Sequence, residues 1–183
     1  GGSNGIGLGI ARAFRAANAS VAITGRKAKA SDYAEDLSGF EYHSAEMTDE
    51  AAVERVAAAF DRLDILVNNA GASLMAEDEW RPEVFERALR LHLFASFRLA
   101  VRLKDRIGKS AIEGGGSVLN MASMSAFRAV TVVPGYGAAK AAVVQMTANM
   151  GVAWALDNVR VNAVAPGLIR SEMTKGMVGT PFE

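Results

Sequence analysis

The stretch GGSNGIGLGIA, residues 1–11, places Gly1, Gly5 and Gly7 directly before an apolar helical pattern. Apolar residues recur at helical spacing over residues 5–18, which predicts a helix that starts within the glycine-rich loop. Such a loop suits a pyrophosphate, because the backbone can come close and the helix N-terminus offers free N–H groups and a partial positive charge. Glycines at a strand–helix turn also serve packing alone, so the loop by itself leaves both interpretations open.

Composition narrows the class of protein. The chain has 183 residues, half of them hydrophobic and 22% charged, which is typical of one globular domain with a real core. The formal net charge of zero argues against nucleic acid as a partner, because neutralising phosphates needs a basic surface. The absence of cysteine excludes disulfides, thiolate nucleophiles and cysteine-ligated metals, and it fits a cytoplasmic location. No apolar run is long enough to predict a membrane span.

Strands and helices are predicted to alternate along the whole chain. The predicted helices cover residues 5–18, 28–37, 49–61 (with Thr48 as its N-cap), 81–107 and 135–156. The predicted strands cover residues 20–25, 40–45, 64–71, 117–123 and 159–167. These strands are continuous apolar runs, which is the pattern of a parallel sheet covered on both faces. We therefore predict a single α/β domain over residues 1–183, with a three-layer, doubly wound parallel sheet of the Rossmann type.

The position of the glycine loop raises a question about the sheet. In the doubly wound strand order 3-2-1-4-5-6, the strand before this loop lies between the strands predicted at 20–24 and 64–68. Without that strand two rows of backbone groups lose their partners, and each buried unpaired group costs about 1–3 kcal/mol. We therefore expect a strand ending in Thr before Gly1 and a further strand after Glu183, so that residues 1–183 are a fragment of a longer chain.

The end of the second predicted strand bears on the choice of nucleotide. In a Rossmann unit an acidic residue at this place binds the 2′-OH of NAD, whereas a nearby Arg accommodates the 2′-phosphate of NADP. Here the strand reads AITGRK, so Gly25 stands where the acid would be and Arg26 and Lys27 follow. The guanidinium can hold a phosphate through two hydrogen bonds. A solvated basic turn is the alternative interpretation, and the local chemistry favours NADP(H), with NAD(H) possible.

A tyrosine and a lysine have the spacing of an acid–base pair. Tyr136 and Lys140 are four residues apart on a predicted helix, which puts both side chains on one face. A neighbouring ammonium stabilises a phenolate and is expected to lower the phenol pKa toward neutral. Ser123 ends a predicted parallel strand, at the edge of the sheet where α/β proteins bind ligands, and it can hold a substrate carbonyl. Ser125 is a second candidate for that role, and chance pairing of the tyrosine and lysine is the alternative interpretation.

With these features in place, the chain resembles the short-chain dehydrogenases/reductases over essentially its whole length. GGSNGIG is similar to the TGxxxGxG loop of that family without its leading Thr, and NNAG at 68–71 matches the motif after the fourth strand. Ser123, Tyr136 and Lys140 match the catalytic Ser and the YxxxK pair in identity and spacing. The resemblance implies an oxidoreductase that transfers a hydride between a nicotinamide cofactor and a carbonyl or alcohol.

The resemblance also implies roles for individual residues. Tyr136 would be the general acid or base, Ser123 would orient the substrate oxygen, and Lys140 would lower the phenol pKa and hold the nicotinamide ribose. Pro166, Gly167 and Ile169, with Ser171 or Thr174 as the hydroxyl, would contact the nicotinamide end. The remaining implied cofactor-binding residues are Gly1, Ser3, Asn4, Gly5, Ile6, Gly7, Arg26, Glu46, Met47, Asn69, Ala70 and Gly71.

One position departs from the family pattern. The helix predicted at 81–107 usually carries an Asn that helps to hold a water in the proton relay behind the Lys, and here the chain reads RLHLF with His92 at that place. His92 is a silent interior residue, a substitute relay group, or a sign that the relay and most of the activity are lost. The acidic run AEDEW at 76–80 is interpreted as a solvated loop, and no ligand spacing predicts a catalytic metal.

The long helices predict a partner. The family packs the helices near 81–107 and 135–156 against symmetry mates, and residues 138–156 are apolar on more of their circumference than one sheet face needs. We therefore expect a homo-oligomer, a dimer or a homotetramer, with a core inside the subunit as the alternative. Two functions remain: an NADP(H)-preferring oxidoreductase acting on a small carbonyl or alcohol, or a catalytically weak nucleotide-binding homologue that works as a sensor or scaffold.

Overall fold

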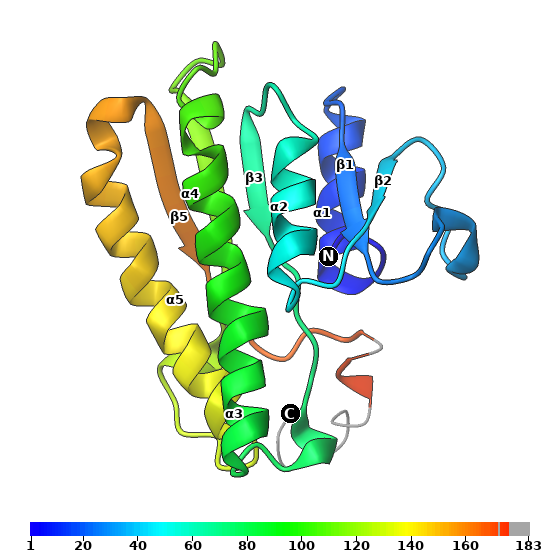
Figure 1. Ribbon diagram of the computed structural model, residues 1–183, viewed down its shortest axis with the longest axis vertical. Coiled ribbons are helices and arrows are strands. Elements are labelled where there is room, and N and C mark those ends of the chain that lie inside the picture. The colour runs from blue at the N-terminus through cyan, green and yellow to red at the C-terminus, as the bar shows by residue number, and fades with distance from the viewer. Residues whose placement is uncertain (172, 176–183) are drawn as a thin grey trace. The chain divides into compact units, whose positions relative to one another are not determined.

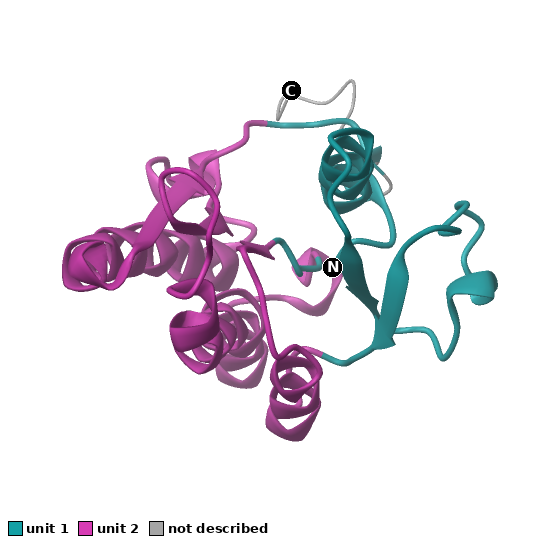
Figure 2. Cartoon of the chain, turned by 90° about the horizontal axis from the view of Figure 1, so that it is seen from above, with its two compact units in different colours: residues 1–46, 69–72, 168–183 teal, residues 47–68, 73–167 magenta. Residues whose placement is uncertain are grey.

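In the computed structural model, which describes residues 1–171 and 173–175, the chain has two compact units (Figure 2). The first unit consists of residues 1–46, 69–72 and 168–183. The second consists of residues 47–68 and 73–167.

The first unit is built on helix α1 and two parallel strands (Figure 1). Its elements are α1 (Gly5–Ala16), β1 (Ala22–Gly25), the 3₁₀ turn η1 (Ala30–Asp32) and β2 (Glu41–Ser44). Leu8 and Ala11 of α1 pack with Ile23 of β1 and with Leu37 into a small buried core. This packing explains why the apolar face of α1 is needed directly after the glycine loop.

The helix predicted at 28–37 does not form. Only the turn η1 lies there, because side chains compete with the backbone pattern of a helix. The Asp32 carboxylate accepts a hydrogen bond from the Lys29 N–H, and the Tyr33 hydroxyl accepts one from the Lys27 N–H. These contacts hold the segment in a turn.

The second unit contains a three-stranded parallel sheet in the order β3-β4-β5. Its strands are β3 (Ile65–Asn68), β4 (Gly116–Met121) and β5 (Val159–Val164). Its helices and short turns are α2 (Glu50–Ala58), η2 (Met75–Glu77), α3 (Pro82–Leu89), η3 (Arg90–Phe94), α4 (Ala95–Ile107), η4 (Met124–Ala126), α5 (Pro134–Ala153) and η5 (Ala155–Asp157). Helix α4 packs on β3 and β4, α5 packs on β4 and β5, and α2 packs on α4 (Figure 1).

These strands confirm the α/β class and the parallel direction predicted from the sequence. The order within each sheet is also the predicted one, because β2 pairs with β1, and β4 lies between β3 and β5. The predictions of a single domain and of further strands outside residues 1–183 stay predictions.

Two local predictions need correction in the second unit. Helix α2 has Asp49 and not Thr48 as its N-cap, because the Asp49 carboxylate accepts the Ala51 N–H at 2.9 Å. The helix predicted at 81–107 is interrupted by the π-helical turn η3, which lies between α3 and α4 and contains His92. Single π turns inside α-helices occur frequently at functional sites.

Candidate active site

The second unit brings the three predicted catalytic residues together. Ser123 lies two residues beyond the carboxyl end of β4, and Tyr136 lies in the first turn of α5 with Lys140 one turn later. The Tyr136 phenol is hydrogen-bonded to the Ser123 side chain. The Ser123 hydroxyl oxygen also accepts the Ser125 N–H at 3.2 Å, which fixes its place at the strand end. Parallel strands direct ligands to this edge of the sheet, so the pair lies where chemistry is expected.

Lys140 is buried beside the tyrosine ring. Its side chain is 5% exposed, its Nζ lies 5.6 Å from the centroid of the Tyr136 ring, and it donates a hydrogen bond to the Met121 carbonyl at the end of β4. Burial lowers the pKa of Lys140 to about 8, because desolvation disfavours the charged form. A helix and a strand end thus hold one cation next to the proposed acid–base group.

The pKa of Tyr136 is raised above its ordinary value, and burial is the main cause. The hydrogen bond from Ser123 works in the opposite direction, and the negative charge of Glu79 raises the pKa further. We expected Lys140 to lower this pKa, but the net direction is upward. Desolvation of the phenolate and the charge of Glu79 outweigh the hydrogen bond from Ser123, and Lys140 is not among the causes of the shift.

His92 touches the same tyrosine. Its side chain is 2% exposed, and its ring stands perpendicular to the Tyr136 ring with centroids 4.9 Å apart. The π-helical turn η3 places the imidazole there, and that turn was not predicted from the sequence. His92 therefore lies beside the predicted acid–base residue, and its role stays a prediction.

Sequence reasoning missed Glu79. The run AEDEW was interpreted as a solvated loop, and Glu77 and Asp78 are indeed exposed, but Glu79 is 1% exposed. Its Oε2 atom accepts the backbone N–H of Tyr136 at 2.7 Å. Three acidic residues in a row have the same appearance in a sequence, so only the tertiary structure distinguishes the buried one.

Below this cluster, three polar side chains form a buried chain of hydrogen bonds. Asn68 donates to the side-chain oxygen of Asn120 at 2.9 Å, and Asn120 donates to the Thr147 hydroxyl at 2.9 Å. The network joins β3, β4 and α5, and all three side chains are buried. A shift of α5 along the sheet would break these bonds and leave buried amide groups without partners, which is costly. The network therefore fixes α5 against β3 and β4, and with it the positions of Tyr136 and Lys140 on that helix.

The first unit contains the glycine loop. A Cβ atom on Gly7 would collide with the Gly1 carbonyl oxygen and the Asn69 side-chain amide, which donates to that carbonyl at 2.6 Å. Gly5 has a φ of +51°, which favours glycine, and the Gly2 N–H donates to the Thr24 carbonyl at 3.0 Å. The loop is thus a close-packed turn that leads into the N-terminus of α1.

The end of β1 is packed by two tyrosines. A Cβ atom on Gly25 would collide with the Tyr33 hydroxyl and would lie 2.9 Å from the Tyr42 hydroxyl oxygen. Both hydroxyls are held by Lys27: its N–H donates to Tyr33 at 3.0 Å, and its carbonyl accepts from Tyr42 at 2.6 Å. Arg26 is exposed. Any side chain at position 25 would collide with these hydroxyls, which explains why a glycine stands where an acidic residue binds NAD.

The other predicted cofactor residues are placed as follows. In the first unit Ser3 is buried, Ile6, Asn69 and Ala70 are half-buried, and Asn4, Glu46, Gly71 and Ile169 are exposed. Ser171 is half-buried, and its N–H donates to the Thr174 hydroxyl at 3.0 Å. In the second unit Met47 is buried, and the Pro166 carbonyl, next to the exposed Gly167, accepts the Met124 N–H at 3.0 Å.

Neither a membrane-spanning helix nor a cluster of metal-binding side chains is present in the described part of the chain. Among residues 1–171 and 173–175, no helix has the length and apolar character to cross a bilayer. Over the same ranges, no three His, Asp or Glu side chains gather in a way that could hold a metal ion.

Comparison with known proteins identifies the family. The family model described as short chain dehydrogenase matches residues 1–180. The chain belongs to the short-chain dehydrogenase family. It is therefore a member of a family of NAD(P)-dependent dehydrogenases and reductases.

The relatives of this short-chain dehydrogenase are named for different substrates. It is 32% identical to an NAD-dependent glycerol dehydrogenase of Listeria innocua, with 98% of this chain and 74% of the relative covered. It is 33% identical to a 3alpha-hydroxysteroid dehydrogenase of Mediterraneibacter gnavus, with 97% and 74% covered. The solved NADP complex of RhlG from Pseudomonas aeruginosa matches with a TM-score of 0.82 at 29% identity, covering 98% of this chain and 75% of that one.

Proposed function

We propose that this protein is an oxidoreductase that transfers a hydride between NADP(H) and a carbonyl or secondary alcohol, with Tyr136 as the general acid or base. The observation that carries the proposal is the cluster in the second unit, where the Tyr136 phenol is hydrogen-bonded to Ser123 and lies against a buried Lys140. A hydroxyl, a phenol and an ammonium of these types supply orientation, a proton and charge stabilisation.

The proposed roles follow from the geometry of this cluster. Ser123 orients the substrate oxygen by hydrogen bonding, and the Tyr136 phenol gives a proton to that oxygen in reduction or takes it in oxidation. Lys140 stabilises the phenolate that remains after the proton has left, because its positive charge lies beside the ring. The nicotinamide supplies or accepts the hydride when it is bound.

The first unit has residues that fit a dinucleotide. Gly1, Gly7 and Asn69 approach so closely that a Cβ atom on Gly7 would collide, and this tight turn leads into the N-terminus of α1, which suits a pyrophosphate. We propose that the loop residues Gly1, Ser3, Asn4, Gly5, Ile6 and Gly7 hold this group. The other proposed contacts with the cofactor are Glu46, Met47, Asn69, Ala70, Gly71, Pro166, Gly167, Ile169 and Ser171, with Tyr136 and Lys140 at the nicotinamide ribose.

The surroundings of Gly25 support NADP(H) over NAD(H). The fixed hydroxyls of Tyr33 and Tyr42 occupy the space that an acidic side chain would need, so no carboxylate at this position can bind a ribose 2′-OH. Arg26 is exposed next to it and forms no ion pair within the described part of the chain. A free guanidinium at this place suits a 2′-phosphate.

The position of His92 supports a role for this residue in the proton transfer. A ring that lies 4.9 Å from the Tyr136 ring and is 2% exposed is a close neighbour of the reacting group. We propose that His92 takes the place of the relay Asn of the family, because imidazole exchanges protons near neutral pH. The second candidate function, a catalytically weak nucleotide-binding sensor or scaffold, is favoured by the raised pKa of Tyr136.

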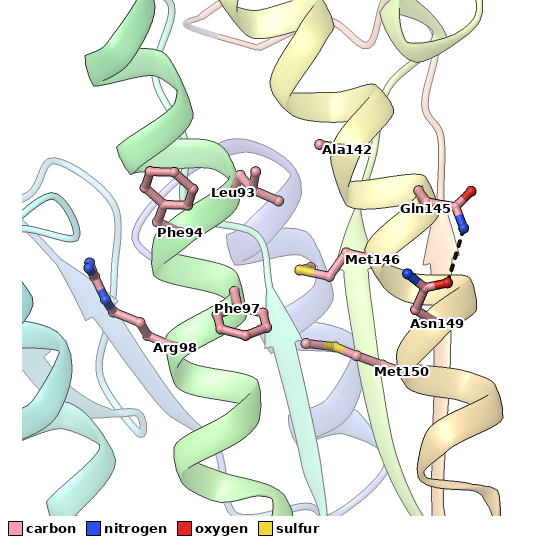
Figure 3. Close-up of a pocket in the computed structure, with 9 residues that line it drawn as sticks. All are labelled: Leu93, Phe94, Phe97, Arg98, Ala142, Gln145, Met146, Asn149 and Met150. Carbon is pink, nitrogen blue, oxygen red and sulfur yellow. Dashed lines mark hydrogen bonds between the residues drawn. The ribbon is translucent and has the colours of Figure 1, made fainter.

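An apolar groove on the second unit supports the proposal that this chain binds a second copy of itself. It lies in the second unit between η3–α4 and α5, and Figure 3 shows the side chains that line it. Phe94 and Phe97 are 42% and 48% exposed there, which is unusual for large apolar side chains grouped together. The lining residues are Leu93, Phe94, Phe97, Arg98, Ala142, Gln145, Met146, Asn149 and Met150. We propose that these helices pair in a dimer or tetramer.

Replacement of Tyr136 by Phe tests the proposed function. With NADPH and a panel of carbonyl substrates, the full chain is expected to consume NADPH, and Tyr136→Phe is expected to lose about 10²–10⁴-fold in turnover, the usual range for a general acid or base. The affinity for NADPH is the control, and it should stay within a few-fold of wild type. Near-normal turnover of Tyr136→Phe contradicts the mechanism, and tight NADPH binding without turnover of any substrate supports the sensor or scaffold.

A further inference from the structure

The buried carboxylate of Glu79 is not used by the proposed mechanism. It lies in the loop between η2 and α3, directly after Asp78, whose φ is +59°. Its side chain is 1% exposed, and within residues 1–171 and 173–175 no Lys, Arg or His forms an ion pair with it. Burial of a carboxylate costs free energy unless hydrogen bonds compensate the lost hydration. The group that Glu79 binds therefore indicates its role.

That partner is the first turn of α5. The residue before the helix is Val133, which has no side chain able to cap it, and Pro134 has no N–H. The Tyr136 N–H is one of the few donors left at this helix end, and Glu79 accepts it at 2.7 Å from 57 positions earlier in the sequence. Glu79 therefore supplies the cap that the local sequence lacks, at the residue proposed as the acid or base.

The neighbouring residues hold the same junction. The indole N–H of Trp80 donates to the Thr131 carbonyl at 2.9 Å, which ties the segment before α5 to the loop of Glu79. A Cβ atom on Gly135 would lie 3.1 Å from the Cα of Phe85 in α3 and 3.3 Å from Oε2 of Glu79. The start of α5 is thus closely packed against α3 and this loop, and it has little freedom to shift.

We propose that Glu79 is a positioning residue for Tyr136, because its carboxylate accepts the Tyr136 N–H and so fixes the first turn of α5. Since this carboxylate is bound to the backbone of the same residue, its negative charge lies close to Tyr136 and opposes ionisation of the phenol. This inference rests on the proposed function, because Tyr136 must act in proton transfer for its position to matter. Among the described residues of the second unit, the charged or titratable groups beside Tyr136 are Lys140 on α5, His92 on η3 and Glu79 itself, with the Ser123 hydroxyl after β4. Glu79 is the only anion among these groups.

Two substitutions separate the hydrogen bond from the charge. Glu79→Gln keeps an oxygen that can accept the Tyr136 N–H but removes the negative charge. Glu79→Ala removes both. The matched control is Glu77→Gln, which removes an exposed acid at the end of the adjoining turn η2 that pairs with Arg87. Each full-length variant is measured for kcat, for KM of NADPH and of the carbonyl substrate, and for the pH dependence of kcat.

We expect distinct results for the two variants. Glu79→Ala should lose about 10- to 100-fold in kcat with little change in the KM for NADPH, since small misplacements of a reacting group cost this much. Glu79→Gln should keep most of kcat, while the limb of the pH profile that belongs to Tyr136 moves to lower pH. Ultraviolet titration of the phenol, taken as the difference between each protein and its Tyr136→Phe variant, should show the same movement without turnover.

The outcomes distinguish this inference from the proposed function. If wild type turns over, Tyr136→Phe is inactive, and both Glu79 variants match the Glu77→Gln control in kcat and pH profile, then Glu79 is not a positioning residue. If Glu79→Ala does not fold, Glu79→Gln decides alone, and an unmoved pH profile and phenol titration overturn the inference. If Tyr136→Phe is as active as wild type, the proposed function itself fails, whatever the Glu79 variants do.

Discussion

Replacement of Lys140 by Met is expected to stabilise the folded protein at neutral pH while it removes a proposed catalytic group. The ammonium is 5% exposed, and burial lowers its pKa from 10.5 to about 8. At about 1.4 kcal/mol for each pKa unit, this difference means that burying the charged form costs about 3 kcal/mol near pH 7. Met has a similar length and no charge, so it avoids that cost.

One favourable contact is lost in the variant. Lys140 donates to the Met121 carbonyl, and a hydrogen bond of this kind contributes about 1 kcal/mol. The net expectation at pH 7 is therefore a free energy of unfolding about 2 kcal/mol higher in Lys140→Met than in wild type. Turnover should fall, because the phenolate of Tyr136 loses its neighbouring cation.

The pH dependence gives the sharper test. The folded protein releases the Lys140 proton at a lower pH than the unfolded chain, so the unfolded chain binds more protons between about pH 8 and pH 10.5. The wild type therefore gains stability as pH rises through this window, and the advantage of the variant falls to about zero near pH 10. Urea unfolding of both proteins without nucleotide from pH 6 to pH 10 measures this difference.

Lys109→Met is the matched control, because Lys109 is exposed. It should change stability little and by the same amount at every pH. If Lys140→Met is less stable than wild type at pH 7, or if the difference between them does not change with pH, then Lys140 does not carry the burial cost inferred from its position.

Three further expectations follow from the sites described above. Arg26→Ala should weaken NADPH binding by about 10- to 100-fold, the value of a charged hydrogen bond, and leave NADH binding nearly unchanged; fluorescence titration measures both, and an equal loss for the two nucleotides contradicts the assignment. His92→Asn should alter the pH–rate profile, whereas superimposable profiles would remove the imidazole from the mechanism. Phe97→Glu should give a monomer by light scattering at concentrations where wild type is a dimer or tetramer; a wild-type protein that is itself monomeric refutes the proposed pairing.

From the sequence alone, the fold class, the pairing of two proposed catalytic residues and the family could be predicted. Continuous apolar strands that alternate with helices are typical of a parallel sheet, and the strand direction and order within each sheet agree with that prediction. The pairing of Tyr136 and Lys140 on one helix face is a consequence of helical geometry, so a spacing of four residues is sufficient to predict it. The order of the motifs along the chain is sufficient to predict the family, which the family model confirms.

Other features were decided only by tertiary structure, because they depend on contacts between residues far apart in the chain. Glu79 looks like its exposed neighbours in the sequence, yet its burial against α5 makes it a cap for a helix 57 positions away. The need for glycine at position 25 comes from two tyrosine hydroxyls contributed by other segments. The upward direction of the Tyr136 pKa comes from burial, and spacing carries no information about burial of this kind.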